Sequence, residues 1–95
     1  MTFNINLSQT ATEQLTEAFQ YYDERGKGND FLDEVYRIFD LISENPKLFP
    51  IDFDIFRRAT VQKFPYLIIY FTDVNDVVVT SVFNTRQNPD KRFPY

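Results

Sequence analysis

The sequence predicts a two-layer α+β domain in which a helical hairpin packs on a small, mainly antiparallel sheet, in the order β-α-α-β-β-β. Three observations lead to this fold class. An alternating apolar pattern opens the chain, two stretches with helical apolar spacing follow before residue 45, and β-branched or apolar runs dominate from residue 55 onwards. A chain of 95 residues can fill one compact core, so we expect a single domain over residues 1–95.

The first two elements are a short strand over residues 2–7 and an amphipathic helix. Phe3, Ile5 and Leu7 alternate with asparagines, which is the period-two pattern of a strand with one buried face. Ser8 then stands where a helix N-cap is expected. Beyond it, apolar residues recur at helical spacing and form one stripe, made of Ala11, Leu15, Ala18, Phe19 and Tyr22.

A second helix follows after a short turn. Residues 25–28 contain both glycines of the protein, so we expect positive φ angles that close the first helix and reverse the chain. Asn29 or Asp30 is the expected N-cap, and Asn45-Pro46 is the expected stop. The stripe between them is Phe31, Val35, Ile38, Phe39 and Ile42. Because the link is short, the two helices should pack antiparallel.

The rest of the chain is predicted to be strands. Residues 47–50 read as a tight connector, and residues 55–62 are compatible with a strand. Two continuous apolar runs, at residues 67–71 and 77–83, predict an antiparallel hairpin closed by a polar turn at residues 73–76. Such runs are typical of central strands, and the helical hairpin is expected to cover one of their faces.

Composition excludes several kinds of chemistry. The chain contains no cysteine, histidine or tryptophan. It therefore has no disulfide, thiolate nucleophile, imidazole base or imidazole metal ligand, and any catalysis must use carboxylates, Lys, Arg, Tyr, hydroxyls or backbone groups. No apolar run approaches the roughly 20 residues that span a bilayer, and the N-terminus lacks the features of a signal peptide, so we expect a cytoplasmic protein without membrane contact.

The formal net charge of −4 hides a division along the chain. Residues 1–55 carry four basic and eleven acidic residues, a balance of −7, whereas residues 56–95 carry six basic and three acidic ones, a balance of +3. The two halves should present opposite electrostatic fields. An alternative is that helices simply carry more surface acids than strands do.

The acidic residues predict no metal site and no cofactor. Those at helical positions lie mainly opposite the apolar stripe and indicate a solvated face; they are Asp30, Asp33, Glu34 and Asp40. Residues 73–76 are similar to the start of a calcium loop, but the glycine and the distal glutamate that such a loop needs are missing. Gly26 and Gly28 form no phosphate loop, because the Gly-Lys-Ser/Thr ending is absent.

The basic residues of the second half are candidates for a functional surface: Arg57, Arg58, Lys63, Arg86, Lys91 and Arg92. In a strand that begins at residue 55, Arg57 and Arg58 point to opposite faces, so at least one lies on the surface or lines a groove. Guanidinium groups bind phosphates through paired hydrogen bonds. Ordinary solubilising residues are the alternative, and composition alone leaves both interpretations open.

Several segments resemble the RelE/ParE superfamily of toxins from bacterial toxin–antitoxin modules. The matching motifs occur in family order and at family spacing, namely Glu-Asn-Pro-x-x-Phe-Pro at residues 44–50, Arg-Arg at 57–58, Phe-Pro-Tyr at 64–66 and Arg-x-x-Pro at 86–89. The similarity covers nearly the whole chain and implies the same fold that periodicity predicts. It also implies an antitoxin partner, which is typically an extended segment that wraps the toxin.

The resemblance leaves the target open, because RelE-like members cut messenger RNA on the ribosome whereas ParE-like members inhibit DNA gyrase. The chain is closer to the ParE or plasmid-stabilisation branch. It has Tyr66 where ribonuclease members often place an arginine, and Asn84 where many relatives carry a histidine. Asparagine cannot exchange a proton near neutral pH. These two residues join the six basic ones as candidates for target binding, with no catalytic residue assigned.

Three hypotheses follow from this resemblance. The first is a ParE-like toxin that acts by binding a target protein such as gyrase, and is therefore not an enzyme. The second is a ribosome-dependent endoribonuclease that uses Arg58, Lys63 and Arg86. The third is an inactive family member that serves as an interaction module. An exposed strand edge makes a homodimer a further expectation.

Overall fold

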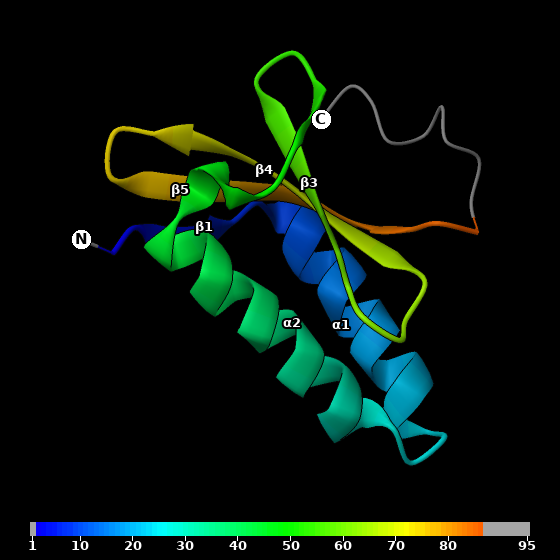
Figure 1. The fold of residues 1–95 in the computed structure, drawn as a ribbon. Helices are drawn as coiled ribbons and strands as arrows, with labels where there is room; N and C mark the ends of the chain where they lie inside the picture. Colours follow the sequence, from blue (N-terminus) through cyan, green and yellow to red (C-terminus); the bar gives the residue numbers. More distant parts are fainter. Residues whose placement is uncertain (1, 87–95) are drawn as a thin grey trace.

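The computed structural model describes residues 2–86, which form two layers (Figure 1). The elements along the chain are β1 (Asn4–Leu7), α1 (Gln9–Asp23), α2 (Gly28–Glu44), the 3-10 helix η1 (Pro46–Leu48), β2 (Ile51–Phe53), β3 (Phe56–Thr60), β4 (Tyr66–Asp73) and β5 (Asp76–Asn84). The strands build one five-stranded sheet in the order β1-β5-β4-β3-β2. Strand β1 runs parallel to β5, and the other three pairings are antiparallel. The predicted fold class is confirmed.

The sheet differs from the prediction in one strand and one turn. Strand β2 lies within a stretch for which no element was predicted, because three residues are too few for periodicity to detect. The turn between β4 and β5 is shorter than the predicted turn over residues 73–76. Asp73 pairs with Asp76, so only Val74 and Asn75 lie between the two strands. The two predicted apolar runs occupy the centre of the sheet, as expected.

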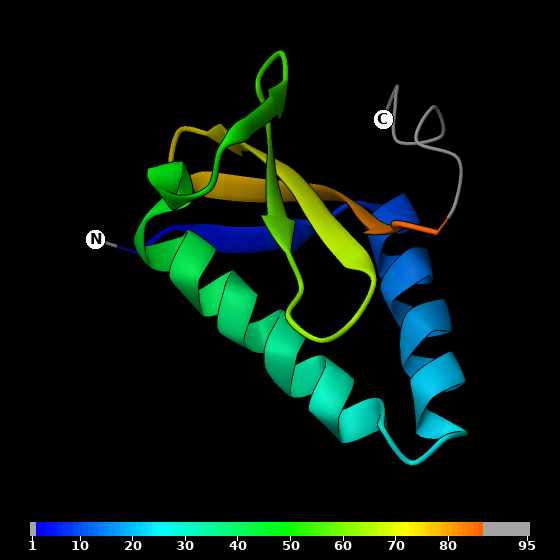
Figure 2. The same ribbon diagram turned by 45° about the vertical axis from the view of Figure 1, so that its right-hand side comes forward.

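Both helices lie on the same face of the sheet and form the predicted antiparallel hairpin (Figures 1 and 2). The predicted N-cap of α1 is confirmed, because the Ser8 Oγ accepts a hydrogen bond from the Ala11 backbone N–H at 3.0 Å. The same hydroxyl donates to the Thr80 carbonyl at 3.1 Å, and the Ser8 N–H donates to the Val79 carbonyl at 2.9 Å. Ser8 therefore joins the start of α1 to β5.

The predicted N-cap of α2 is wrong. The helix begins at Gly28, ahead of both Asn29 and Asp30, and its N-cap residue Lys27 makes no side-chain hydrogen bond. Gly26 has the positive φ angle of 73° that reverses the chain. Gly28 is buried, and a Cβ atom at this position would lie 2.9 Å from Phe19 Cε1. The start of α2 therefore packs closely against Asp23 and Phe19 of α1 and has no capping side chain.

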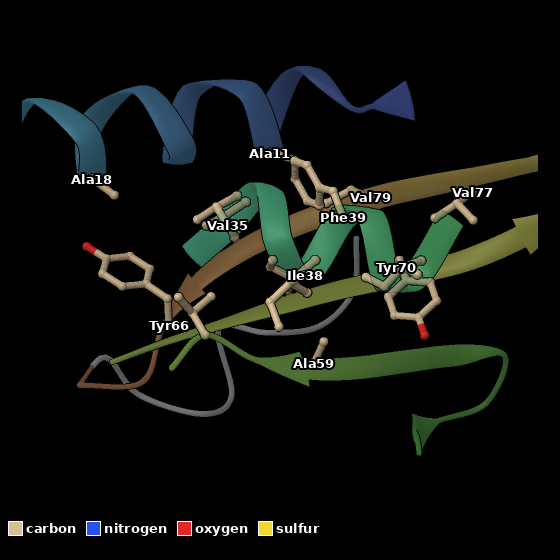
Figure 3. Packing of buried hydrophobic residues seen from close by; sticks show 14 of the residues in the cluster. Ala11, Ala18, Val35, Ile38, Phe39, Ala59, Tyr66, Tyr70, Val77 and Val79 are labelled. Atoms are coloured by element: carbon tan, nitrogen blue, oxygen red, sulfur yellow. The ribbon is translucent and has the colours of Figure 1, made fainter. Parts of the chain in front are cut away.

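The core lies between the helices and the sheet. Figure 3 shows Ala11 and Ala18 of α1 facing the strands, with Val35 and Ile38 of α2 beside them. The buried residues of β3, β4 and β5 complete this layer, among them Ala59, Ile68, Tyr70, Val77 and Val79. Within residues 2–86, no helix has the length and apolar character needed to cross a bilayer.

Candidate functional site

Arg57 contacts the chain segment that precedes β2. Its Nη1 donates a hydrogen bond to the Phe49 carbonyl at 2.8 Å. Nearby, the Tyr70 hydroxyl donates to the Pro46 carbonyl at 2.6 Å, and burial raises the pKa of Tyr70 to about 12. Together these two side chains hold the 3-10 turn against the sheet. Arg57 thus stabilises the connection between η1 and β2, a role that its position in the sequence does not reveal.

Arg58 points to the other face of β3, as the period of a strand predicts. Its Nη1 lies 3.8 Å from the Asp52 Oδ1 of β2. The Asp52 side chain is only 11% exposed, whereas that of Arg58 is 40% exposed. Arg58 therefore compensates a nearly buried carboxylate at the edge of the sheet.

Lys63 lies in the turn between β3 and β4, where its φ angle is 72°. Its side chain borders a hollow of about 360 Å³ together with acidic residues of the first turns of α2. These residues are Asp30, Asp33 and Glu34. The positive charge of Lys63 thus faces the acidic end of the helical layer and lies apart from Arg57 and Arg58.

Tyr66, Asn84 and Arg86 are the predicted residues that the fold brings together. Tyr66 begins β4 and Asn84 ends the neighbouring β5, where the two residues are paired. The Asn84 Nδ2 donates a long hydrogen bond of 3.5 Å to the Tyr66 hydroxyl, and the Asn84 Oδ1 accepts from the Arg86 N–H at 2.9 Å. The start of β4 and the end of β5 therefore carry a small polar cluster.

Burial determines the ionisation of this cluster. It raises the pKa of Tyr66, and the neighbouring Tyr22 acts in the same direction. The hydrogen bond from Asn84 and the charge of Arg86 oppose this shift without cancelling it. Burial also raises the pKa of Tyr22, again against the charge of Arg86. Both phenols are therefore neutral hydrogen-bonding groups near neutral pH.

Helix α1 forms the other wall of the site. A hollow of about 230 Å³ lies between this helix and the polar cluster, and it is lined by Gln14, Glu17, Ala18 and Tyr21 of α1 and by Tyr66, Val82 and Asn84 of the sheet. Figure 3 shows the Tyr66 hydroxyl on the side of Ala18. The hollow offers amide, phenol and carboxylate groups, which suit recognition by hydrogen bonds.

Gln14 is the residue of this site that sequence reasoning missed. Its Oε1 accepts hydrogen bonds from the Val82 N–H at 2.8 Å and from the Ser81 hydroxyl at 3.0 Å. Strand β1 pairs with β5 only up to Val79, so Gln14 satisfies a backbone donor that lies beyond the end of this ladder. The local sequence gives no signal of this role, because the partners lie 67 and 68 residues away.

The ring of Tyr66 packs in an aromatic cluster. Its ring packs at 5.4 Å from that of Phe31 and at 6.2 Å from that of Tyr22. Phe64 packs against Tyr22 at 4.8 Å and against Phe31 at 5.2 Å. These contacts join both helices to the start of β4, so the position of the Tyr66 hydroxyl is set by the core.

Two predicted candidates, Lys91 and Arg92, lie outside the described residues. Within residues 2–86, no three carboxylate side chains lie close enough together to hold a metal ion. Arg57 binds the Phe49 carbonyl, Arg58 lies beside Asp52, and Lys63 borders a hollow with acidic residues of α2. The described part of the chain thus concentrates its candidate site at Tyr66, Asn84 and Arg86.

A helical hairpin on a mixed sheet, with a polar cluster at the start of β4, places the chain among the small α+β domains of the RelE/ParE type. The family defined as the ParE toxin of the type II toxin–antitoxin system, parDE, matches residues 5–89, and the chain belongs to this family. It is thus a ParE-like toxin component of such a system, and a cognate antitoxin is implied as its partner.

A solved structure described as the chromosomal ParDE TA system from P. aeruginosa has the same fold. The TM-score is 0.63 over 87% of this chain and 96% of that chain, with 11% sequence identity. At so low an identity the likeness concerns the fold alone. No curated protein sequence matches the chain.

Proposed function

We propose that the chain arrests growth by binding a target protein, with DNA gyrase as the first candidate, and that its antitoxin neutralises it by direct binding. The contact with the target includes the polar cluster of Tyr66, Asn84 and Arg86. Such a target places the activity in the cytoplasm. On this proposal the chain acts by occupying a surface of its target and carries out no chemical step.

The observation that carries the proposal is the chemistry of this cluster. Cleavage of RNA by its own 2′-hydroxyl is accelerated by a group that takes a proton near neutral pH. Tyr66 is a neutral phenol with a raised pKa, and the Asn84 amide does not titrate. Arg86 can hold a phosphate but remains protonated. These groups are suited to hydrogen bonding with a partner surface.

The placement of the basic residues supports the same proposal. A nuclease that works on the ribosome approaches a dense phosphate surface, for which a continuous basic patch is needed. Here Arg57 binds a carbonyl, Arg58 lies beside Asp52, and Lys63 faces acidic residues of α2. With the net charge of −4, this arrangement favours a protein target over RNA.

The test is expression without the antitoxin, followed by a supercoiling assay with purified gyrase. We expect growth arrest in cells and inhibition of supercoiling at micromolar toxin. Asn84→Ala and Arg86→Ala should weaken both effects, whereas Arg37→Ala, which removes an exposed arginine of α2, should leave them unchanged.

Other outcomes distinguish the remaining functions. New messenger RNA ends in arrested cells, with supercoiling unaffected, would favour the endoribonuclease and overturn the proposal. Absence of any growth effect, despite a folded protein, would favour an inactive interaction module. The expected homodimer does not depend on the target, and sedimentation of the purified chain over a range of concentrations tests it.

A further inference from the structure

The hollow between α1 and the start of β4 has a one-sided hydrogen-bonding character. Three of the polar side chains that line it already make hydrogen bonds inside the protein, namely Gln14, Tyr66 and Asn84. In each of them a side-chain oxygen accepts an internal hydrogen bond, and at least one N–H or O–H group remains. These internal hydrogen bonds therefore determine which kind of ligand group the hollow can bind.

The orientation of the Gln14 amide is fixed by its partners on β5. A backbone N–H can only donate, so the atom of Gln14 that faces the Val82 N–H must be the oxygen. The Gln14 Oε1 accepts from this N–H at 2.8 Å and from the Ser81 hydroxyl at 3.0 Å, which uses both of its lone pairs. The Gln14 Nε2 has no acceptor within residues 2–86. Its two N–H groups are therefore the polar groups that Gln14 offers to the hollow.

Asn84 and Tyr66 show the same polarity. The Asn84 Oδ1 accepts from the Arg86 backbone N–H at 2.9 Å, which fixes the orientation of this amide as well. The Asn84 Nδ2 donates one N–H to the Tyr66 hydroxyl at 3.5 Å and retains a second. Because the Tyr66 oxygen accepts this bond, its own proton remains to be donated, and Figure 3 shows the hydroxyl on the side of Ala18. Both side chains therefore add hydrogen-bond donors to the hollow.

Positive charge lies close to these donors. Burial raises the pKa of both Tyr22 and Tyr66, and the Arg86 guanidinium lowers it, so the charge of Arg86 acts at both hydroxyls. Arg25 lies over the ring of Tyr21, with its Cζ 3.7 Å from the ring centroid. The carboxylate of Glu17 lies in the α1 wall of the hollow. The fixed charges that act on the two phenols are nevertheless those of arginines.

The size of the hollow and the charges around it select the kind of ligand. A volume of about 230 Å³ equals that of roughly eight water molecules at about 30 Å³ each, which is room for one polar side chain. Donors without free acceptors suit a carboxylate, because an ionised carboxylate only accepts hydrogen bonds. A nucleic-acid backbone needs a row of cations, whereas this hollow has Glu17 in its wall. An acidic side chain therefore fits better than a phosphodiester chain.

We infer that this hollow receives the carboxylate of a Glu or Asp side chain of the target protein, held by the Tyr66 hydroxyl and by the amide N–H groups of Gln14 and Asn84. Arg86 stabilises the bound negative charge, and Glu17 opposes it and so limits the affinity. That the carboxylate belongs to the target rests on the proposed function. The preference of the hollow for an anion does not, because it follows from the internal hydrogen bonds.

Titration of the full chain with small model compounds tests the hollow directly. The probe is N-acetyl-glutamate amide, and the matched control is N-acetyl-glutamine amide, which has nearly the same shape without the charge. In proton–nitrogen correlation NMR spectra, the side-chain amide signals of Gln14 and Asn84 should move with the glutamate compound. Its affinity should be about fivefold higher than that of the glutamine compound, because hydrogen bonds to a charged acceptor are about twice as strong as those between neutral groups.

Two isosteric exchanges on α1 have opposite expected effects. Gln14→Glu keeps an acceptor for the Val82 N–H but replaces the two donors by a negative charge, so it should lower the affinity for the glutamate compound at least about tenfold. Glu17→Gln removes the opposing charge and should raise this affinity about threefold. Glu13→Gln is the matched control, because Glu13 is an exposed acid of α1 that bonds to Gln9, and it should leave the affinity unchanged.

Removal of one hydroxyl tests the contribution of β4. Tyr66→Phe keeps the packed ring and should lower the affinity for the glutamate compound about fivefold, whereas Tyr36→Phe, at an exposed position of α2, should have no effect. Circular dichroism verifies that each variant is folded. In the supercoiling assay with gyrase, Gln14→Glu and Tyr66→Phe should weaken inhibition, and Glu17→Gln should strengthen it.

Four results would overturn the inference. The first is equal binding of the glutamate and glutamine compounds, and the second is weaker glutamate binding in Glu17→Gln, which would indicate a cationic ligand. The third is movement of the Gln14 and Asn84 amide signals by a short RNA at lower concentration than by the glutamate compound. The fourth is tighter glutamate binding in Asp90→Asn, which would assign the hollow to a carboxylate of the same chain.

The two proposals fail in different ways. A preference for the glutamate compound without inhibition of gyrase by any variant would support the ligand of the hollow and overturn gyrase as the target. Inhibition of gyrase that Gln14→Glu and Tyr66→Phe leave unchanged would support the target and overturn the role of the hollow in binding it.

Discussion

Gln14 provides the most direct test of how the site is held together. Replacing it by leucine leaves the Val82 N–H and the Ser81 hydroxyl without their acceptor, and both residues are only 1% exposed. Each buried donor without a partner costs about 1–3 kcal/mol, and the Ser81 hydroxyl can rotate, so the lower half of this range applies to it. The apolar leucine side chain returns about 1 kcal/mol.

The net loss expected for Gln14→Leu is therefore about 1–4 kcal/mol of unfolding free energy. Urea unfolding followed by circular dichroism measures it, and with a slope of about 1–2 kcal/mol per molar urea the midpoint should fall by about 0.5–4 M. Gln14→Glu keeps an acceptor at the same position and should cost less than half as much. Gln20→Leu, at an exposed position of the same helix, should change stability by at most about 0.5 kcal/mol.

The outcome that refutes this reasoning is a Gln14→Leu variant as stable as Gln20→Leu. The end of β5 would then be satisfied without α1. In that case the hollow beside Tyr66 would not depend on the contact between α1 and β5, and Gln14 would be only a lining residue.

Three further predictions concern the turns and the buried phenol. Val74 has a φ angle of 55° and is 84% exposed, so Val74→Gly should relieve left-handed strain and raise stability by about 0.5–1 kcal/mol; a loss in thermal unfolding would contradict this. Gly28→Ala should lower the free energy of unfolding by about 1–3 kcal/mol, because the added Cβ lies 2.9 Å from Phe19 Cε1. A denaturation midpoint equal to that of the unmodified chain would contradict this, since it would show that the two helices can move apart without loss of stability. The pKa of Tyr70 is raised to about 12, so the neutral phenol stabilises the fold fully below pH 10, and this contribution is lost as the pH rises from 10 through 12. Tyr70→Phe should remove that part of the pH dependence, and an unchanged profile in alkaline urea titrations would assign it to other groups.

Local patterns in the sequence predict most of the fold. The apolar periods place both helices and the two central strands, and Ser8 is recognised as an N-cap because its partner, the Ala11 N–H, is three residues away. The start of α2 could not be predicted in this way. There Gly28 lies close to Phe19 and Asp23 of α1, and a contact between two helices leaves no local pattern in the sequence.

The candidate site shows the same division. Tyr66, Asn84 and Arg86 could be named from the sequence through a family resemblance, but nothing in it shows that Gln14 lies beside them. Likewise, no strand was predicted at residues 51–53, and only the structure shows that Ile51 and Phe53 of β2 are exposed.

The sequence by itself determined the α+β class, the order of the helices and of every strand except β2, the family resemblance and the absence of cysteine and histidine chemistry. Only the tertiary structure decided which groups Arg57, Arg58 and Lys63 face, that Gln14 joins α1 to β5 over 68 residues, and that Ile51 and Phe53 of β2 are exposed. The physical reason is range. Periodicity and capping act within a few residues, whereas hydrogen bonds and ion pairs between distant segments exist only after the chain has folded.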